Sequence, residues 1–360
     1  MNKKISIITA ITCIASIPNV NACTGITMTA KDNSVVVART VDWAGSKMNN
    51  MYVIVPRGHS EESLLPNNAT GGMPFTAKYG FVGLGMQQPE FVVDGTNEAG
   101  LSAALFYFPA YGKYQPYTPI LKNNSLADFQ VVSWILSQFS TIDEVKEAID
   151  NITIINIDPT ASTVHWRITE PNGRQVVLEI IDGMPTFYEN PLGVIANSPG
   201  LPWHLTNLNN YINIRSGTEN PVKFGPITLR SLSHGTGLLG LPGDFSSPSR
   251  FIRMAFFKNY AIPQDTGFDT AMQSFHLLNN VDVPFGTAYK TGTAKFDMPS
   301  STQWTIATDI TNRKIYYHTM YNRTIRRIDI NQIDFATVPF QYHPLDKTQS
   351  ETIIDAPMNL

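Results

Sequence analysis

The sequence predicts a single α+β domain built in layers, spanning residues 23–347. Segments typical of β-strands follow one another in short succession, and helical periodicity is confined to two pairs of segments. Strands grouped in this way favour a layered α+β arrangement over alternating βαβ units. No linker rich in Pro, Gly or Ser divides the chain, and residues 348–360 form a polar tail that we expect to be loosely held.

Residues 1–22 have the features of a secretory signal peptide. Two lysines at the start precede an uncharged, mostly apolar run over residues 5–17, and the Val-x-Ala pattern of residues 20–22 suits cleavage. The apolar run is shorter than the ~20 residues that a bilayer-crossing helix needs. We therefore expect cleavage after Ala22 and export to the periplasm or the medium, with no membrane span.

A cysteine directly after such a leader has a second interpretation. Cys23 could be a lipid-attachment site, which would make the protein a lipid-anchored binding protein. The two interpretations exclude each other, because an alkylated sulfur cannot act as a nucleophile. Asn21 is an awkward residue before a lipidated cysteine, so the sequence favours ordinary cleavage.

Composition and charge are those of a globular protein. Hydrophobic residues make up 42% of the chain and charged residues 15%, which excludes a disordered or fibrous class. The net charge of −3 becomes −5 once the two lysines of the leader are removed, and no basic run suggests nucleic acid as a partner.

Of the two cysteines, Cys13 lies in the leader, so the mature chain has one thiol and no internal disulfide. A lone thiol in an exported protein favours a reactive role for Cys23 over a buried apolar one.

The first two elements are predicted to form a hairpin. Residues 24–30 and 34–41 are rich in β-formers and are separated by the turn-forming Lys31-Asp32-Asn33. A turn centred on Asp32 places residues opposite each other when their numbers add up to about 64 or 65. Cys23 should therefore face Val41 or Asp42.

The remaining elements follow in order along the chain. Strands are predicted at residues 51–55, 79–85, 91–94, 101–106, 152–157, 163–169, 175–181 and 194–196, and closing strands at 302–309, 314–321 and 325–330. Helices are predicted at residues 126–139, with Ser125 as N-cap, at 142–149, at 249–260 and at 268–279. Thr141 and Glu144 have the spacing of a capping box at the start of the second helix.

Cleavage before Cys23 would put a thiol and a free α-amine on one residue. Their unperturbed pKa values, near ~8.5 and ~7.7–8.0, lie close to neutrality, so the pair could serve as nucleophile and base. Arg39 would favour the thiolate, and Asp42 could hold the amine. Since Arg39 and Asp42 lie three residues apart, a regular strand would turn them to opposite faces. We expect a bulge near Thr40 or Val41 to bring both to Cys23.

Two other patterns carry less weight. Residues 235–240 read GxGxxG, but Pro242 and Gly243 stand where a phosphate-binding helix should continue, which indicates ordinary glycine turns. The seven histidines show neither i,i+3 nor i,i+4 pairs, so the pattern does not favour a zinc site. A cysteine–histidine hydrolase stays open, because its residues meet only in the fold.

Several motifs together resemble the choloylglycine hydrolase and penicillin V acylase family of N-terminal-nucleophile cysteine hydrolases. The resemblance rests on Cys23-Thr24-Gly25, Ala38-Arg39-Thr40-Val41-Asp42-Trp43, residues 94–101 (DGTNEAGL), Ala196-Asn197-Ser198-Pro199, residues 237–245 (GLLGLPGDF) and Ser249-Arg250-Phe251. These motifs occur in the family's order across most of the mature chain.

The resemblance implies a four-layer αββα sandwich and the hydrolysis of linear, non-peptide amide C–N bonds. Cys23 would attack the amide carbonyl with its own α-amine as base, and neither metal nor cofactor would be needed. Asn197 matches the family's oxyanion asparagine, and the N–H of Tyr107 falls where the family has its second donor. Arg250 matches an active-site arginine, and Arg39 and Asp42 complete the set.

The resemblance also bears on substrate and assembly. Bile salt hydrolases typically resemble one another in having Asn at the position of Tyr107, whereas penicillin V acylases can have Tyr. We therefore expect phenoxyacetyl amides such as penicillin V first, conjugated bile salts second, and long-chain N-acyl amides third. Residues 211–235 resemble the family's assembly loop, which implies a homotetramer.

Overall fold

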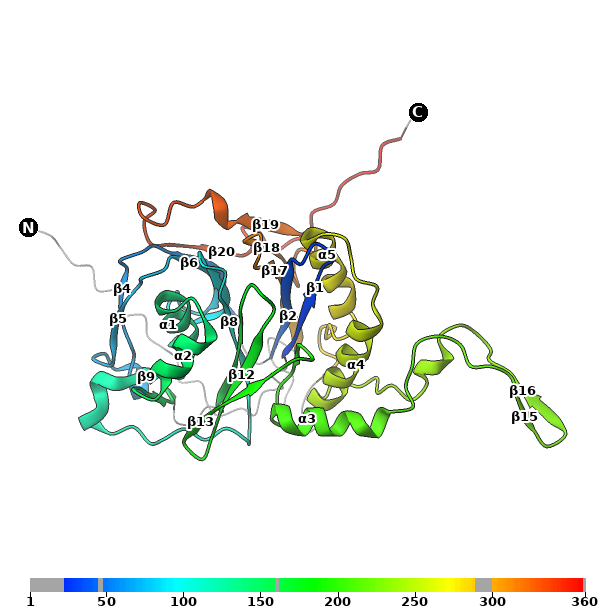
Figure 1. Cartoon of the computed structure of the whole chain (residues 1–360). Coiled ribbons are helices and arrows are strands. Elements are labelled where there is room, and N and C mark those ends of the chain that lie inside the picture. The colour runs from blue at the N-terminus through cyan, green and yellow to red at the C-terminus, as the bar shows by residue number, and fades with distance from the viewer. Residues whose placement is uncertain (1–22, 45–47, 159–161, 289–299, 359–360) are drawn as a thin grey trace, which may run out of the picture.

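Two antiparallel sheets lie face to face between two layers of helices (Figure 1). The structure is a computed structural model and describes residues 23–44, 48–158, 162–288 and 300–358. The predicted leader, residues 1–22, lies outside the described residues. This four-layer α+β arrangement confirms the predicted fold.

In the described residues the first sheet has six strands, of which the predicted hairpin forms the second and third. Its order is β14 (Val194–Ile195), β1 (Cys23–Thr29), β2 (Val35–Trp43), β17 (Ser301–Asp309), β18 (Lys314–Thr319) and β19 (Arg326–Asp329). Cys23 pairs with Val41, one of the two registers expected from the turn. The pairing of β1 with β2 continues without a shift to Thr29 and Val35.

Eight strands of the described chain form the second sheet. Its order is β13 (Met184–Glu189), β12 (Gln175–Ile181), β11 (Val164–Thr169), β8 (Ser102–Tyr107), β7 (Val92–Asn97), β6 (Phe81–Met86), β3 (Asn50–Val55) and β20 (Gln341–Pro344). Smaller two-stranded pairs are β4 (Ser60–Glu62) with β5 (Pro74–Thr76), β9 (Ser125–Ala127) with β10 (Thr153–Ile155), and β15 (Val222–Phe224) with β16 (Ile227–Leu229).

Helices cover the outer face of each sheet. Helix α1 (Val131–Gln138) packs on β7 and β8, and α2 (Ile142–Ile149) follows it. On the other side, α4 (Ser247–Tyr260) packs on β1 and β14, and α5 (Gly267–Leu278) packs on β1, β2 and β17. The predicted capping box is confirmed, since Thr141 Oγ1 accepts from Glu144 N and the Glu144 carboxylate accepts from Thr141 N.

The space between the sheets is partly apolar and partly polar. Leu84 of the eight-stranded sheet belongs to one apolar cluster with Val41 and Trp304 of the six-stranded sheet. Nearer Cys23, Gly25 lets the sheets approach, because a Cβ there would meet Phe106 Cζ and Ile195 Cγ2 at 2.8 Å. This close approach accounts for the glycine two residues after Cys23.

Several elements differ from their predictions. Ser125 does not cap a helix; it begins β9, which pairs in parallel with β10, and α1 begins only at Val131. Its side chain instead donates to Leu121 O at 2.9 Å. Sequence patterns also missed β13 and the short helix α3 (Leu201–Asn207), because neither has a clear period of apolar residues.

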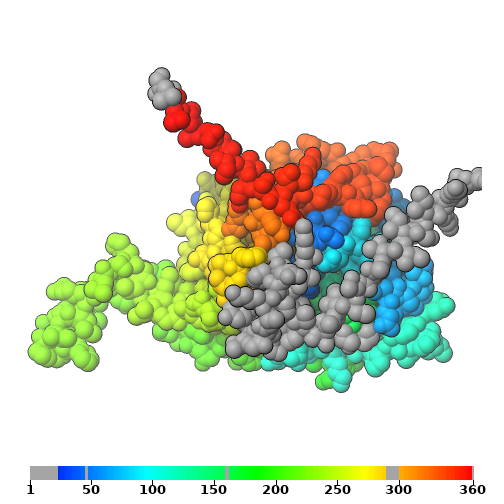
Figure 2. Space-filling view, turned by 180° about the vertical axis from the view of Figure 1, so that it is seen from behind, coloured from blue at the N-terminus to red at the C-terminus, as the bar shows by residue number. Residues whose placement is uncertain are grey.

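Two segments project from the body of the molecule. The strands β15 and β16 form the tip of a long arm, and residues 348–358 leave the top of the body as an exposed stretch without helix or strand (Figure 2). In the described parts of the chain no helix is long and apolar enough to cross a membrane.

Candidate active site

Cys23 lies at the first position of β1, with 6% of its surface exposed. Side chains alternate along a strand, so its thiol shares a face with Gly25, which approaches Phe106 of the opposite sheet. The thiol therefore points into the space between the sheets. It lies at the start of β1, which is next to the edge strand β14.

The side chain of Asn197 hydrogen-bonds to the main chain of Cys23. Asn197 Oδ1 accepts a hydrogen bond from the main-chain nitrogen of Cys23 at 2.7 Å, and the side-chain Nδ2 donates to Tyr107 O at 2.7 Å. Cys23, Asn197 and Tyr107 come from β1, the loop after β14 and the end of β8. The structure thus brings together three residues that the sequence assigned to one site.

Arg250 holds the other side of Cys23 and Asn197. From α4, its Nη1 donates to Cys23 O at 2.5 Å and to Thr24 Oγ1, and its Nη2 donates to Asn197 Oδ1 at 2.7 Å. Burial lowers the pKa of Arg250, and the nearby Asp42 opposes that effect. A buried, forked cation in this position fixes both the chain at Cys23 and the carboxamide of Asn197.

The main chain of Tyr107 turns its polar groups away from β11, and its carbonyl meets Asn197. Phe108 N donates to Thr163 O, so the alternation of an antiparallel ladder turns the groups of Tyr107 away from β11. Tyr107 O accepts from Asn197 Nδ2, and the N–H of the same residue points to the same side of the strand. Asn197 Nδ2 has two hydrogens, of which one is used here.

Arg39 lies between the sheets with no hydrogen bond to Cys23. Its Nη1 donates to Leu105 O at 2.5 Å and to Val93 O at 3.3 Å, and its guanidinium carbon lies 3.9 Å from the centre of the Phe106 ring. Beside it, Arg167 Nη2 donates to Asp94 Oδ2 at 3.1 Å. Two arginines and one aspartate are thus buried together, which leaves an excess of positive charge near the thiol's face of the sheet.

Asp42 faces away from Arg39, toward the helical layer. Its Oδ1 accepts from Thr302 Oγ1, and its Oδ2 is buried without a hydrogen bond among the described residues. Burial raises the pKa of Asp42 to about 7, against the opposing effect of Arg250.

The expected bulge in β2 is therefore wrong. Strand β2 stays regular opposite β1, and the register shift at this site lies in β17, between Thr302 and Trp304. Because the strand is regular, Arg39 and Asp42 stay on opposite faces, and among the described residues neither hydrogen-bonds to Cys23.

Sequence reasoning missed the residues that support this site from a distance. Thr24 accepts from Arg250, Thr302 donates to Asp42, and Ser247 Oγ accepts from Asn197 N at 3.0 Å. Serine and threonine are too common for their positions alone to signal such roles. In the described residues no histidine hydrogen-bonds to Cys23, and no group of three His, Cys, Asp or Glu is placed to hold a metal ion.

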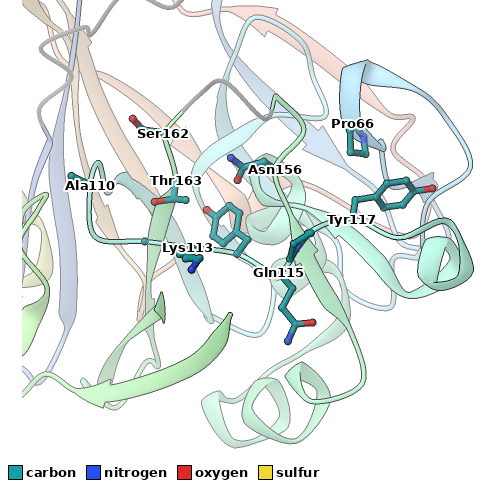
Figure 3. A pocket seen from close by; sticks show the side chains of 11 residues that line it. Pro66, Ala110, Lys113, Gln115, Tyr117, Asn156, Ser162 and Thr163 are labelled. Atoms are coloured by element: carbon teal, nitrogen blue, oxygen red, sulfur yellow. The ribbon is translucent and has the colours of Figure 1, made fainter. Parts of the chain in front are cut away.

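A cavity of about 380 Å³ opens beyond the last residue of β8 and the first residue of β11 (Figure 3). Its lining includes Pro66, Ala110, Tyr114, Tyr117, Asn156 and Thr163. Thr163 Oγ1 donates to Phe108 O at 2.7 Å, next to Tyr107. The cavity therefore adjoins the strand end that carries Tyr107.

Two antiparallel sheets between helical layers, with a thiol on the first residue of a strand, define an N-terminal-nucleophile hydrolase. Residues 23–350 match the family described as linear amide C-N hydrolases, choloylglycine hydrolase family. The chain belongs to this family and is a linear amide hydrolase. The match begins at Cys23, where the leader is predicted to end.

Named relatives agree with this assignment. A bile salt hydrolase/transferase of Clostridium perfringens is 33% identical over 335 residues, covering 91% of this chain and 98% of its own. A bile salt hydrolase/transferase of Lactiplantibacillus plantarum is 30% identical over 330 residues, covering 90% and 97%.

Solved structures share the fold. A mutant of the conjugated bile acid hydrolase from Clostridium perfringens superimposes with a TM-score of 0.81 at 29% identity, covering 93% of this chain and 100% of that one. The penicillin V acylase from Agrobacterium tumefaciens gives 0.68 at 22% identity, covering 89% and 90%. At that identity the acylase shows the fold alone.

Proposed function

We propose that this enzyme hydrolyses the amide bond of glycine- or taurine-conjugated bile salts. The sequence comparisons support this substrate class, because relatives at 30% identity or more over most of the chain are bile salt hydrolases. The sequence-based preference for penicillin V is therefore reversed, and penicillin V becomes the second candidate. Tyr107, a residue that penicillin V acylases can have at this position, is the observation that keeps it.

The contact between Cys23 N and Asn197 Oδ1 carries the proposed mechanism. Once cleavage frees the α-amine, the amine takes the thiol proton and the sulfur attacks the amide carbonyl carbon. The C–N bond then breaks, and the ammonium returns its proton to the departing amine. A water molecule, deprotonated by the same amine, attacks the thioester carbonyl, and release of the carboxylic acid restores the thiol.

The negative charge on the attacked carbonyl oxygen needs fixed donors. We assign these to the second hydrogen of Asn197 Nδ2 and to the main-chain N–H of Tyr107, the residue whose carbonyl already accepts from Nδ2. Donors of this kind contribute about 10²–10³ in rate each. Asn197 is held for this role from two sides, because Arg250 and Cys23 both donate to its Oδ1.

We assign Asp42 to the α-amine of Cys23 and Arg39 to its thiol. Asp42 Oδ2, buried without a partner in the described residues, is the acceptor we assign to the α-ammonium after cleavage. Arg39 supplies positive charge on the thiol's side of the sheet, held there by Leu105 O and Val93 O. Asp42 and Arg39 can therefore serve the amine and the thiol from opposite faces of β2, and the mechanism needs no bulge in that strand.

The mechanism requires that residues 1–22 are removed after Ala22, as in an exported protein. Intact mass of the protein isolated from its exporting cell tests this directly. The expected mass is that of a chain starting at Cys23 with an unmodified thiol. Added diacylglyceryl mass would identify a lipid-anchored protein instead and would end the proposal.

Rates on glycocholate and penicillin V, measured side by side on that processed protein, test the substrate. We expect faster hydrolysis of glycocholate, and no turnover of either amide by a Cys23→Ala variant. Faster turnover of penicillin V would reverse the two candidates. Full activity of the Cys23→Ala variant would refute the mechanism.

We also propose that the projecting arm joins copies of this chain into a homotetramer. Phe224 and Val222 of β15 and Ile227 of β16 are 66%, 58% and 54% exposed, on a segment that extends away from the body (Figure 1). Light scattering after gel filtration should give four chains per particle, and fewer for a Val222→Ser/Phe224→Ser variant. A matched change at Ile120, which is 91% exposed elsewhere, should leave the mass unchanged. A monomeric wild-type protein would exclude the proposal.

A further inference from the structure

Two buried histidines hold the main chain on either side of the Asn197 peptide. His165 Nε2 lies 3.0 Å from Ala196 O, and His204 Nε2 lies 3.0 Å from Asn197 O. Both imidazoles are almost completely buried, at 1% and 2% exposure. A carbonyl oxygen can only accept, so in each case the imidazole Nε2–H is the donor. Consecutive carbonyls thus receive donors from two different elements.

His165 is fixed on β11 by aromatic rings and by a carboxylate. The Phe108 ring stacks on it at 4.3 Å with an angle of 7°, and the Phe106 ring meets it edge-on at 6.2 Å. Its Nδ1 lies 3.3 Å from Glu179 Oε1, which leaves the Nε2 side free to face Ala196. The imidazole therefore has a single orientation.

Glu179 connects this histidine to helix α3. The same Oε1 accepts from Leu201 N at 2.8 Å, at the first residue of the helix. Gly200 leaves room for the carboxylate, since a Cβ there would come within 2.5 Å of Glu179 Oε2. The start of α3 is thus held to the same buried carboxylate that orients His165.

Helix α3 then carries His204 back to the site. The His204 ring stacks on the ring of Phe251 in α4, with 4.5 Å between the ring centres and 12° between the ring planes. Phe251 directly follows Arg250 in the chain. Burial lowers the pKa of His204 to about 4, so the imidazole is neutral at neutral pH, and its Nδ1 is buried without a hydrogen bond among the described residues. The proton on Nε2 is the one that Asn197 O receives.

We propose that His165 and His204 are positioning residues, which fix the Asn197 peptide so that its side-chain amide faces the attacked carbonyl. The proposal rests on the function assigned above to Asn197. Neither histidine hydrogen-bonds to Cys23 in the described part of the chain, and the proposed role involves no proton exchange with the substrate. Their role is to set the direction of the main chain from which the Asn197 side chain extends.

These contacts form a closed ring, which is why they can hold the Asn197 peptide accurately in place. From Ala196 the contacts pass through His165 and Glu179 to Leu201, and from there helix α3 leads through His204 back to Asn197. The Asn197 N–H is held separately by Ser247 Oγ at 3.0 Å. Catalytic donors need placement within about 0.5 Å, and a misplacement of about 1 Å can cost about 10² in rate.

Replacing His204 by Gln and by Asn separates positioning from simple packing. The Gln side chain carries an N–H donor three bonds from Cβ, as His Nε2 is, whereas the Asn donor is one bond closer and cannot reach Asn197 O. We expect kcat to fall about 10- to 100-fold in His204→Asn and less than about fivefold in His204→Gln, with KM changed less than about threefold in both. The same pair of variants at His165 should follow the same order.

His318 provides the matched control. It is 5% exposed, packs on Phe275 at 5.2 Å, and burial lowers its pKa to about 4, but it lies on β18 away from Asn197. Gln and Asn at position 318 should lower Tm without separating in kcat.

Equal kcat for Gln and Asn at position 204, in variants that fold as judged by Tm, would overturn the role of His204; position 165 is judged by its own pair. All variants are assayed on whichever amide the wild-type enzyme hydrolyses. Failure of the wild type on glycocholate therefore counts against the proposed substrate and not against this inference.

Discussion

Asn197 Oδ1 lies 2.7 Å from the main-chain nitrogen of Cys23, and the same oxygen accepts from Arg250 Nη2 at 2.7 Å. One carboxamide thus receives two donors on its oxygen and presents its nitrogen to Tyr107 O. Because both ends of the amide are engaged, it cannot flip without breaking these hydrogen bonds. The residue that orients the nitrogen of Cys23 is therefore also the residue placed to stabilise the substrate oxygen.

Replacing Asn197 by Ala should cut kcat by about 10²–10³ with little change in KM, because the lost donor acts on charge that develops in the transition state. Asn190 is the matched control. It is 3% exposed, like Asn197, and its Nδ2 donates to Val194 O at 2.9 Å within the preceding loop. Asn190→Ala should lower Tm but leave kcat within about threefold. Equal losses of kcat in the two variants would remove the special role of Asn197.

Replacing Arg250 by Lys should lower kcat at least about tenfold and also lower Tm. One ammonium cannot reproduce a fork that reaches Cys23 O, Thr24 Oγ1 and Asn197 Oδ1 together. Arg253→Lys, on the same helix, is the control, because among the described residues Arg253 donates to main-chain oxygens of Pro242 and Asp244 and not to Cys23 or Asn197. Kinetics and thermal unfolding of both variants check this, and unchanged kcat in Arg250→Lys would contradict it.

Asp94 should be essential to stability because it is shared between buried cations. Replacing it by Asn leaves Arg167 and Arg39 uncompensated, and we expect a loss of about 3–5 kcal/mol in the free energy of unfolding. Adding Arg167→Met should recover part of that loss. Urea unfolding of wild type, both single variants and the double variant measures the coupling. Strict additivity of the two single effects would show that no such coupling exists.

Asp128 should make the fold less stable as pH rises. Burial raises its pKa to about 7 from an ordinary value of 3.8. The folded state therefore binds the Asp128 proton more tightly than the unfolded state. The contribution of this proton to the free energy of unfolding is fully present below about pH 4 and is lost as pH rises to about 7. The Tm of Asp128→Asn relative to wild type should increase between pH 4.5 and pH 8. Asp150, an exposed carboxylate, gives the control, and a difference independent of pH at position 128 would count against this assignment.

The hairpin and the outer helices could be predicted from the sequence because their signals are local. The turn at Asp32 predicted Val41 or Asp42 opposite Cys23, of which Val41 is the partner found, and Thr141 with Glu144 marked the start of α2. Ser125 was misleading, since the residue can equally begin a short strand when a partner such as β10 lies beside it. The partner is distant in sequence and leaves no local signal.

The motifs predicted three residues that lie around Cys23, but they did not predict where Arg39 and Asp42 lie. Motif resemblance supplied Asn197, Tyr107 and Arg250, which the structure brings together around Cys23. Alternation along β2 correctly put Arg39 and Asp42 on opposite faces, but the assumption that both must touch Cys23 led to a bulge that does not exist. His165 and His204 could not be found from spacing, because they act on main-chain carbonyls, which any sequence provides.

The central claim is that removing residues 1–22 creates the catalytic base on Cys23. The most direct measurement compares a protein that begins at Cys23 with one that keeps a single uncleaved residue in front of it, each verified by intact mass and by Tm. The account predicts amide hydrolysis only by the protein with the free Cys23 amine, at least about 10²-fold above the other. Equal kcat in the two proteins would contradict it.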